Sequence, residues 1–249
     1  MPMPRLSVNL NKIALLRNSR RTGVPDVLRF AALARSAGAD GITLHPRPDE
    51  RHIRSDDVFA LAELIGPWRP SFELNLEGYP DERFLSLCTR VRPEQCTLVP
   101  DSPTAFTSEE GWKIDDNDTQ IVSDAVSALK SIGGRVVVFV DPEAAVVERV
   151  PRTGADGIEI YTGGYAAAAR RGSPGTQLRA CTEAAQMAAD RRLVVNIGHD
   201  LNLENMPALV SAMPALAEAS IGHELTADAL EMGFERAVMA YKAALRRAG

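Results

Sequence analysis

The chain has four histidines, and each stands at or just after the end of an apolar, strand-like run: His45, His52, His199 and His223. The run before His199, for example, reads Leu-Val-Val-Asn-Ile-Gly over 193–198. The unperturbed pKa of histidine lies near neutrality, so its side chain often carries protons in catalysis. A single such histidine is commonly a capping or packing residue. Because α/β folds place their chemistry at the ends of strands, the four together predict an acid–base site.

Other polar residues stand at the ends of similar runs. They are Asn9, Asn11 and Lys12 after the first run, and then Arg47, Glu77, Thr107, Glu159, Tyr161, Thr162 and Asn196 along the chain. Two imidazoles and a carboxylate that share one cleft can transfer protons in both directions. We expect burial to raise the pKa of Glu77 towards neutrality, which makes it a usable base. By itself, Glu77 is equally compatible with a carboxylate that caps a helix.

The basic residues favour small anionic ligands. Four of the 28 basic residues are lysines, and Lys12 is the only lysine at an expected strand end. Two arginine clusters lie near strand ends: Arg17, Arg20 and Arg21 after the first run, and Arg47, Arg51 and Arg54 around His52. Guanidinium groups bind phosphate well, and a lysine can hold a phosphate or form a Schiff base. Glycines expected in the neighbouring loops can bind phosphate through backbone N–H groups: Gly163, Gly164, Gly198 and Gly222.

Metal chemistry is not indicated by the sequence. His199, Asp200 and His223 could act as ligands, but metal sites usually gather three or more such groups with clear supporting hydrogen bonds, and nearby arginines repel a cation. We therefore expect no metal site. The three cysteines have no CxxC spacing, so neither a disulfide framework nor a zinc site is predicted.

The composition excludes several classes of protein. The net charge of −5 and the pI of about 5.5 are atypical of a nucleic-acid-binding surface, which needs a basic stripe. The N-terminal Met-Pro-Met-Pro-Arg lacks the apolar stretch of a signal peptide, and no run approaches the roughly eighteen apolar residues of a membrane span. We therefore expect a cytoplasmic protein that binds neither nucleic acid nor a membrane.

Strand-like and helical segments alternate along the whole chain. Short runs rich in Val, Ile and Leu predict strands near 6–9, 41–45, 71–77, 95–99, 135–140, 157–160, 193–197 and 219–222. Helices are predicted near 25–37, 55–65, 80–91, 117–132, 142–152, 174–191, 203–213 and 225–247. Gly38 and Gly154 are expected to end helices, and each leads into the tetrapeptide Ala-Asp-Gly-Ile. The repeat predicts two equivalent helix-to-strand junctions.

This alternation predicts the fold. Eight strands that alternate with helices in 249 residues, without a linker, predict a single-domain (β/α)8 TIM barrel over 1–249. All strands of such a barrel are parallel, so their carboxyl ends meet at one mouth. A doubly wound sheet is the alternative. It would normally carry a glycine-rich turn after the first strand, but 8–12 reads Val-Asn-Leu-Asn-Lys.

Seven motifs, in order over essentially the whole chain, resemble those of one known family. The first two are Val-Asn-Leu-Asn-Lys-Ile-Ala-Leu-Leu-Arg-Asn-Ser-Arg at 8–20 and Gly-Ala-Asp-Gly-Ile-Thr-Leu-His-Pro-Arg at 38–47. The others are Arg-His-Ile at 51–53, Leu-Val-Pro at 98–100, Ile-Glu-Ile-Tyr-Thr-Gly at 158–163, Asn-Ile-Gly-His at 196–199 and Ile-Gly-His at 221–223. Together they resemble the signature of the pyridoxine 5′-phosphate synthase family.

The resemblance implies a TIM barrel with extra helices, which assembles as a homo-octamer and uses no metal or organic cofactor. It also implies two small phosphorylated substrates. 1-Deoxy-D-xylulose 5-phosphate would condense with 3-amino-1-hydroxyacetone 1-phosphate (3-amino-2-oxopropyl phosphate). The products would be pyridoxine 5′-phosphate, phosphate and water, in vitamin B6 biosynthesis.

The same resemblance assigns roles to single residues. His45 and Glu77 resemble the family's proton acceptors, and His199 its proton donor. The amino-ketone phosphate would contact Asn9, Arg20, Gly222 and His223, and the deoxyxylulose phosphate would contact Arg47, His52 and Thr107. In the family, an arginine placed like Arg20 reaches into the site of a neighbouring subunit.

The chain departs from the family pattern at three places. Asn11-Lys12 replaces the Asp-His of some members, Asp200 replaces a glycine, and Tyr161 replaces a histidine. The proposed proton carriers remain, and we still expect Asn11, Lys12 and Asp200 to contact substrate. Two alternative functions stay open: a Schiff-base aldolase that uses Lys12, and a sensor that binds phosphate ligands without catalysis.

Overall fold

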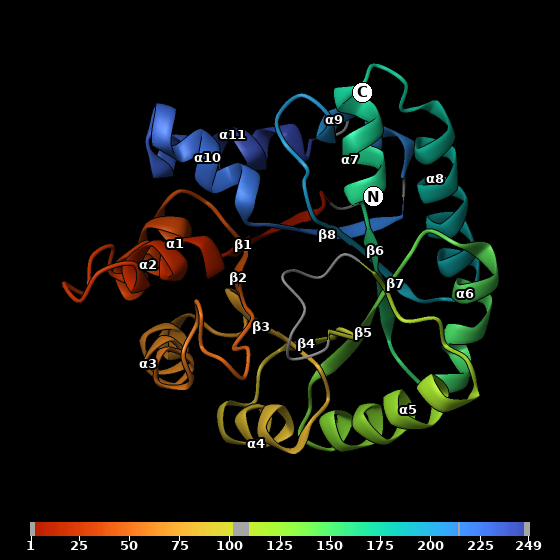
Figure 1. Ribbon diagram of the computed structural model, residues 1–249, viewed down its shortest axis with the longest axis horizontal. Coiled ribbons are helices and arrows are strands. Elements are labelled where there is room, and N and C mark those ends of the chain that lie inside the picture. Colours follow the sequence, from red (N-terminus) through yellow and green to blue (C-terminus); the bar gives the residue numbers. More distant parts are fainter. Residues whose placement is uncertain (1–2, 102–109, 214, 247–249) are drawn as a thin grey trace.

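Eight parallel strands close into a barrel in the order of the sequence, with β1 hydrogen-bonded to β8 (Figure 1). The computed structural model describes residues 3–101, 110–213 and 215–246. The strands are β1 (Arg5–Asn9), β2 (Gly41–Leu44), β3 (Glu73–Gly78), β4 (Gln95–Leu98), β5 (Arg135–Val140), β6 (Gly157–Tyr161), β7 (Val194–Gly198) and β8 (Leu216–Ile221). Each lies close to its predicted position, and the predicted TIM barrel is confirmed.

The helices surround the ring of strands (Figure 1). They are α1 (Asn11–Asn18), α2 (Val27–Ser36), α3 (Ser55–Ile65), α4 (Glu82–Val91), α5 (Asp116–Ser131), α6 (Ala144–Arg149), α7 (Gly163–Arg170), α8 (Gly175–Asp190), α9 (Met206–Ala212), α10 (His223–Met232) and α11 (Phe234–Ala244). Short 3₁₀ turns cover Gly66–Trp68 and Val150–Thr153. Among these described helices, none has the length and apolar character needed to cross a membrane.

Two helices lie where the sequence pattern predicts loops. No helix is predicted between the first strand and the helix near 25–37. The structure has α1 there, which begins immediately after β1, where the Asn9 side chain accepts a hydrogen bond from the Asn11 N–H (2.9 Å). The prediction that Gly163-Gly164 lies in a mouth loop is also wrong, because these glycines open α7. Four consecutive alanines follow within α7, and alanine is the strongest helix former.

The predicted terminal helix over 225–247 is wrong as well. It consists of α10 and α11, which are separated by Gly233. The φ of Gly233 is 89°, a left-handed value that interrupts an α-helix and that glycine adopts without steric cost.

The two Ala-Asp-Gly-Ile repeats form equivalent junctions, as predicted. The Asp40 carboxylate accepts a hydrogen bond from the backbone N–H of Leu6 (2.7 Å), and the Asp156 carboxylate accepts one from Val136 (2.9 Å). The glycine after each aspartate lies against the next strand, where a Cβ would come within 2.6 Å of a carbonyl oxygen. Each aspartate therefore ties its strand to the preceding strand, and each glycine allows close contact with the following one.

The inside of the barrel carries an unusual number of polar side chains. The hydroxyl of Thr43 lies at the centre of one layer, within 2.6 Å of Ser7 Oγ, 3.2 Å of Ser220 Oγ and 3.3 Å of Asn75 Nδ2. Thr97 donates to Asn75 Oδ1 at 3.2 Å. We call these five residues the polar layer. Because every member is buried and hydrogen-bonded, the side chains of the layer are held by directional bonds as well as by packing.

Candidate active site

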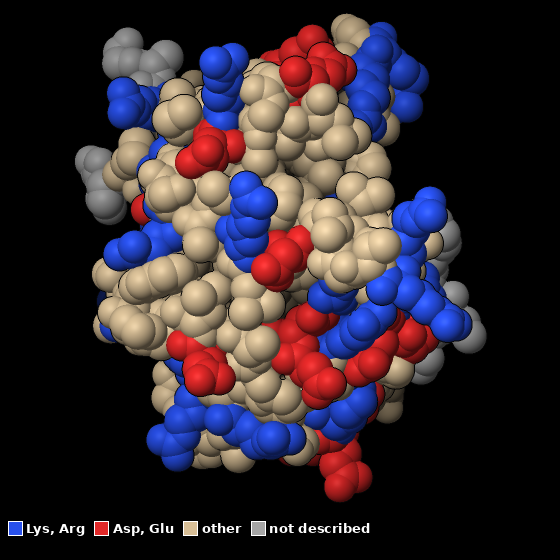
Figure 2. Space-filling model, turned by 90° about the vertical axis from the view of Figure 1, so that its left-hand side faces the viewer, with Lys and Arg blue, Asp and Glu red and all other residues tan. Residues whose placement is uncertain are grey.

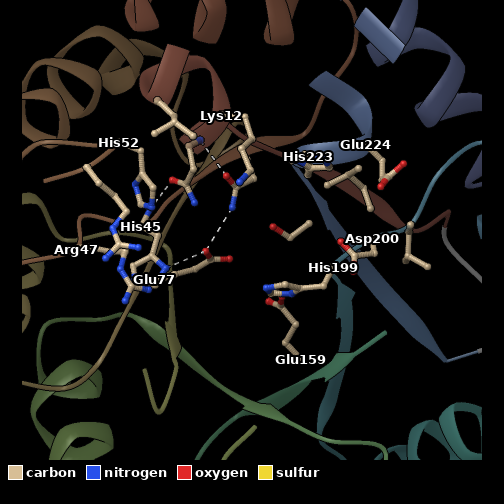
Figure 3. Close-up of a pocket in the computed structure, with 18 residues that line it drawn as sticks. Lys12, His45, Arg47, His52, Glu77, Glu159, His199, Asp200, His223 and Glu224 are labelled. Atoms are coloured by element: carbon tan, nitrogen blue, oxygen red, sulfur yellow. Dashed lines mark hydrogen bonds and ion pairs between the residues drawn. The ribbon is translucent and has the colours of Figure 1, made fainter. Parts of the chain in front are cut away.

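A cavity of about 330 Å³ lies at the carboxyl ends of the strands (Figure 3). Eleven of the thirteen predicted site residues line it: Asn9, Asn11, Lys12, His45, Arg47, His52, Glu77, His199, Asp200, Gly222 and His223. They come from β1, β2, β3, β7, β8 and the segments that follow these strands. The barrel therefore brings together residues that are more than 200 positions apart in the sequence.

The other two predicted residues do not line this cavity. Arg20 is exposed and follows α1, outside the cavity of its own barrel. Thr107 lies outside the described residues.

A chain of hydrogen bonds links the residues on the β1–β3 side of the cavity. Asn9 Nδ2 donates to Glu77 Oε2 (3.3 Å), and Asn9 Oδ1 accepts from the backbone N–H of Asn11 (2.9 Å). Asn11 Oδ1 in turn accepts from the backbone N–H of His45 (2.9 Å). His45 Nδ1 and Glu77 Oε2 lie 4.0 Å apart. We call Asn9, Asn11, His45 and Glu77 the first wall.

Glu77 has the properties of a carboxylic acid that titrates near neutral pH. Its residue is 5% exposed, and burial raises its pKa to about 8. Repulsion from Asp101 adds to this rise, whereas the hydrogen bond from Asn9 opposes it. The expected rise of the Glu77 pKa is confirmed, and the group can release and accept a proton at physiological pH.

The two histidines of the β2–α3 connection are held as neutral bases. Burial lowers the pKa of His45 well below 6.5, with further lowering by His52 and Arg47. Burial and the Arg47 charge lower the pKa of His52 to about 4. His52 Nδ1 accepts a hydrogen bond from the Ile53 N–H (2.9 Å), so the proton of its neutral ring is on Nε2.

On the β6–β7 side, the backbone around His199 is strained. His199 and Asp200 have φ values of 81° and 58°, which are rare for residues with a side chain. The buried Thr162 hydroxyl lies 2.5 Å from the carbonyl oxygen of Gly198 and 2.6 Å from that of His199. Asn205 Nδ2 donates to the Asp200 carbonyl at 3.3 Å. These contacts hold the turn that directs His199 into the cavity.

The imidazole of His199 packs against two aromatic rings. Its centroid lies 4.9 Å from that of Phe139 and 5.5 Å from that of Tyr161. Nδ1 is buried and has no hydrogen-bond partner within the described residues. Burial lowers the His199 pKa, although the Asp200 charge opposes this effect. His199 is thus neutral in the free protein, and its Nδ1 atom is available to a proton or a ligand.

Glu159 is a site residue that the sequence-based assignment missed. The sequence places it at a strand end but gives it no role, whereas the structure places it in the cavity beneath His199 (Figure 3). Burial, followed by repulsion from Glu77, raises its pKa well above the ordinary range. Its Oε2 atom has no partner among the described residues. The signal in the sequence is a carboxylate inside the buried strand Gly-Ile-Glu-Ile-Tyr. We call Glu159, Thr162, His199 and Asp200 the second wall.

Basic groups lie near the first wall. Arg47 is 3% exposed and is paired with Asp101 at 2.6 Å. Lys12 and Arg51 also line the cavity. On the opposite side, Glu224 lines the cavity and is paired with Arg170 (2.7 Å). No cluster of three or more His, Cys, Asp and Glu residues suited to a metal ion occurs in 3–101, 110–213 and 215–246.

Comparison with known proteins identifies the family. A sequence profile described as "Pyridoxal phosphate biosynthesis protein PdxJ" matches residues 6–247. The chain belongs to the PdxJ family. Similar members are the pyridoxine 5′-phosphate synthases of Chelativorans sp. (strain BNC1), with 46% identity over 247 residues, and Bacteroides fragilis (strain YCH46), with 43% over 244 residues. The alignments cover 98% of this chain in both cases, and 99% and 100% of the two relatives.

Solved structures outside the PdxJ family share the barrel. A tryptophan synthase from Mycobacterium tuberculosis superimposes with a TM-score of 0.66 at 12% identity, covering 99% of this chain and 94% of that one. The YdjI aldolase from Escherichia coli K12 gives 0.62 at 14% identity, covering 98% and 89%. At such low identity these similarities concern the fold alone.

The resemblance to the pyridoxine 5′-phosphate synthase family, found in the sequence motifs, is confirmed by the match to the family profile.

Proposed function

We propose that this PdxJ-family barrel is a pyridoxine 5′-phosphate synthase of vitamin B6 biosynthesis. It would condense 1-deoxy-D-xylulose 5-phosphate with 3-amino-1-hydroxyacetone 1-phosphate to give pyridoxine 5′-phosphate, phosphate and water. One observation carries the proposal: three proton carriers, His45, Glu77 and His199, lie at the carboxyl ends of three different strands and meet in one cavity. The names of the similar relatives and the basic groups that line the cavity support the same reaction.

The first wall suits the steps that remove protons. The amine must be neutral to attack the ketone, and the resulting imine must lose a proton from carbon before the ring can close. Glu77, with a pKa of about 8, and the neutral imidazole of His45 can each accept such a proton. Their separation of 4.0 Å allows both to act on neighbouring atoms of one substrate.

The second wall suits the steps in which phosphate and water leave, because a leaving oxygen needs a proton. His199 is neutral in the free protein, so it can donate only after it gains a proton. An anionic phosphate beside the ring would raise its pKa and favour that gain. The protonated carboxyl of Glu159 beneath the ring can donate a hydrogen bond to the same oxygen.

Two regions are suited to the two phosphate groups. On one side, Arg47 and His52 lie close to the Lys12 charge, and we assign the sugar phosphate to them. On the other, α10 begins at His223, and the free backbone N–H groups of a helix N-terminus bind phosphate well. We assign the amino-ketone phosphate to Gly222 and His223. No cofactor is part of this proposal.

The direct test is to incubate the purified protein with both substrates and to measure pyridoxine 5′-phosphate and released phosphate. Formation of both in equal amounts is expected. Tight binding of both substrates without product would favour a phosphate-ligand sensor. Lys12 lines the cavity, so borohydride reduction with substrate followed by mass spectrometry is the test for a Schiff-base aldolase. A covalent adduct on Lys12 would favour that alternative.

We also propose a homo-oligomer, for which the sequence resemblance suggests eight subunits. Exposed apolar side chains support an interface on the side formed by α1, α10 and α11: Leu15, Leu16, Leu230 and Met239. Figure 2 shows uncharged surface between scattered charged side chains on this side of the molecule. Arg20 is exposed just after α1 and would reach a partner's cavity. The cytoplasmic location stays a prediction.

Subunit mixing tests the shared site. Arg20→Ala and His45→Ala proteins should each be inactive, and activity should return after their subunits exchange, because some sites then contain both intact residues. If mixed oligomers form and no activity returns, Arg20 does not serve a partner's site.

A further inference from the structure

Arg83 is an arginine in an unfavourable place for the helix that carries it. It lies in the first turn of α4. The N-terminus of a helix carries a partial positive charge, so a cation there is destabilising. Its neighbours Asp81 and Glu82 follow the usual preference for acidic residues, and Asp81 caps the helix through the Phe84 N–H (2.7 Å). A role in helix stability therefore does not explain Arg83.

The guanidinium of Arg83 reaches the segment that carries His45. Its Nη2 donates to the carbonyl oxygen of Pro46 at 2.5 Å. Nε and Nη1 are buried, and neither has a hydrogen-bond partner within the described part of the chain. Arg83 also lines a small cavity of about 30 Å³, together with His45, Arg47 and Asp101. The side chain thus lies directly behind two residues that face the active-site cavity.

The carboxylates beside Arg83 are engaged elsewhere. Asp81 accepts the capping hydrogen bond of α4, and Asp101 is paired with Arg47 at 2.6 Å. Among the described residues, Arg83 forms no ion pair with a carboxylate. A half-buried guanidinium that is not engaged in an ion pair acts on other nearby groups, because a low-dielectric interior screens charge weakly.

His45, which is neutral in the free protein, lines the same small cavity as Arg83. The charged and titratable groups around this imidazole are Arg47 and His52 of its own segment, Glu77 of β3, Arg83 of α4, Asp101 after β4 and His199 after β7. Burial is the main reason for the low pKa of His45, and the Arg83 charge lowers it further.

We propose that Arg83 is a positioning residue for the condensation, which fixes the 45–47 segment through the Pro46 carbonyl and places a positive charge behind His45. This inference rests on the proposed function for its kinetic consequences. It adds a residue from outside the cavity to the acid–base machinery. It also separates two effects of one side chain, a hydrogen bond and a charge, which different substitutions remove.

The test compares Arg83→Met, which removes both effects at similar length, with Arg83→Lys, which retains the charge. Arg90→Met is the control, because Arg90 is an exposed arginine of the same helix, placed over the Phe59 ring at 3.9 Å. In Arg83→Met we expect kcat/KM at pH 7 to fall about tenfold because the 45–47 segment loses its anchor. The lower acidic limb, which reflects His45 and lies below the Glu77 limb near pH 8, should move up by roughly half to one pH unit. Arg83→Lys should lose rate but keep the limb in place, and Arg90→Met should change neither.

A second readout does not depend on turnover. The imidazole resonances of His45, assigned with His45→Asn, should titrate at higher pH in Arg83→Met than in the wild type and in Arg83→Lys. Arg83→Gln is the second neutral variant if Arg83→Met does not fold, as judged by circular dichroism. An unmoved His45 titration in the neutral variants, or an equal shift in Arg83→Lys, overturns the proposal. Absence of product from the wild type would instead contradict the proposed function.

Discussion

The two walls of the cavity hold their acid–base groups in different ways. In the first wall, Asn9 and Asn11 link Glu77 to the backbone of His45 through consecutive hydrogen bonds of 2.9–3.3 Å. In the second, His199 Nδ1 and Glu159 Oε2 are buried without partners among the described residues. Figure 3 shows His45 and Glu77 on one side of the cavity and Glu159, His199 and Asp200 on the other.

The difference suggests that the two walls have different functions in the reaction. A buried polar atom without a hydrogen-bond partner destabilises the folded state by about 1–3 kcal/mol. Two such atoms in one wall are therefore unfavourable unless a ligand forms hydrogen bonds with them. The first wall is ordered by the protein itself and is ready to accept protons. The second wall is completed only when a substrate oxygen enters. If this comparison is correct, substitutions of the first-wall bases should lower kcat. Substitutions that loosen the support of the second wall, which must take up substrate before His199 can donate a proton, should raise KM.

The largest effect is expected in the first wall. Glu77→Gln keeps the shape and the hydrogen bond from Asn9 but removes the base. Turnover should fall by roughly 10²–10⁴-fold, the usual contribution of a positioned general base. Steady-state kinetics with both substrates measure this, with Glu63→Gln as the control because Glu63 is exposed on α3. Unchanged turnover would remove Glu77 from the mechanism.

The pH dependence sharpens the same prediction. Since the Glu77 pKa is about 8, kcat/KM should rise with pH up to that value, by about tenfold per unit below it, and Glu77→Gln should lack this limb.

The stability of the folded protein should show the opposite dependence on pH. The folded-state pKa lies above the model-compound value of 4.5, so the stabilisation is complete below pH 4.5 and is lost as the pH rises through 8. Thermal unfolding should therefore show a decline towards pH 9 that is smaller in Glu77→Gln.

A smaller effect is expected where the second wall meets β7. In Gly198→Ala, the new Cβ would lie 2.4 Å from Glu159 Oε1 and 3.3 Å from the Ser220 carbonyl oxygen. The Glu159 carboxyl must move, and we expect a destabilisation of about 1–3 kcal/mol together with weaker substrate binding. Urea unfolding and KM measure these. A variant with wild-type stability and KM would show that the position of Glu159 is not constrained by β7.

The smallest effect is expected from the Thr162 hydroxyl. Thr162→Val removes its hydrogen bond to the Gly198 or His199 carbonyl, worth about 0.5–1.5 kcal/mol, while shape is retained. We expect a twofold to tenfold rise in KM, with recovery in Thr162→Ser. If kcat falls and KM does not change, the second wall is part of the chemistry in the same way as the first, and the comparison fails.

Much of the fold was accessible from the sequence because buried parallel strands are continuous apolar runs with polar residues at their ends. That pattern located His45, Glu77 and His199. It could not locate α1, because the helix follows β1 without a linker and its apolar residues were attributed to a loop. Glu159 received no role because a carboxylate inside a strand is recognised as a site residue only when its neighbours across the barrel are known.

Arg83 could not be predicted from the sequence, for a different reason. Its sequence neighbours place it on a helix that is distant from His45 in the chain, and no local pattern reports its contact with the Pro46 carbonyl. Such contacts depend on the side-chain packing between elements, which periodicity does not encode. The Arg20 assignment is limited in the same way, since it concerns a second subunit.

The polar layer inside the barrel bears on how this enzyme can evolve. A pocket floored by aliphatic side chains can be deepened by a single truncation, which leaves a void that a larger ligand fills. Here the Thr43 hydroxyl contacts Ser7, Asn75 and Ser220 at once, so its loss would leave polar partners buried and unsatisfied. New substrate preferences are therefore more accessible through the segments around the mouth than through the floor, and the depth of the cavity should be the slowest feature to change during divergence.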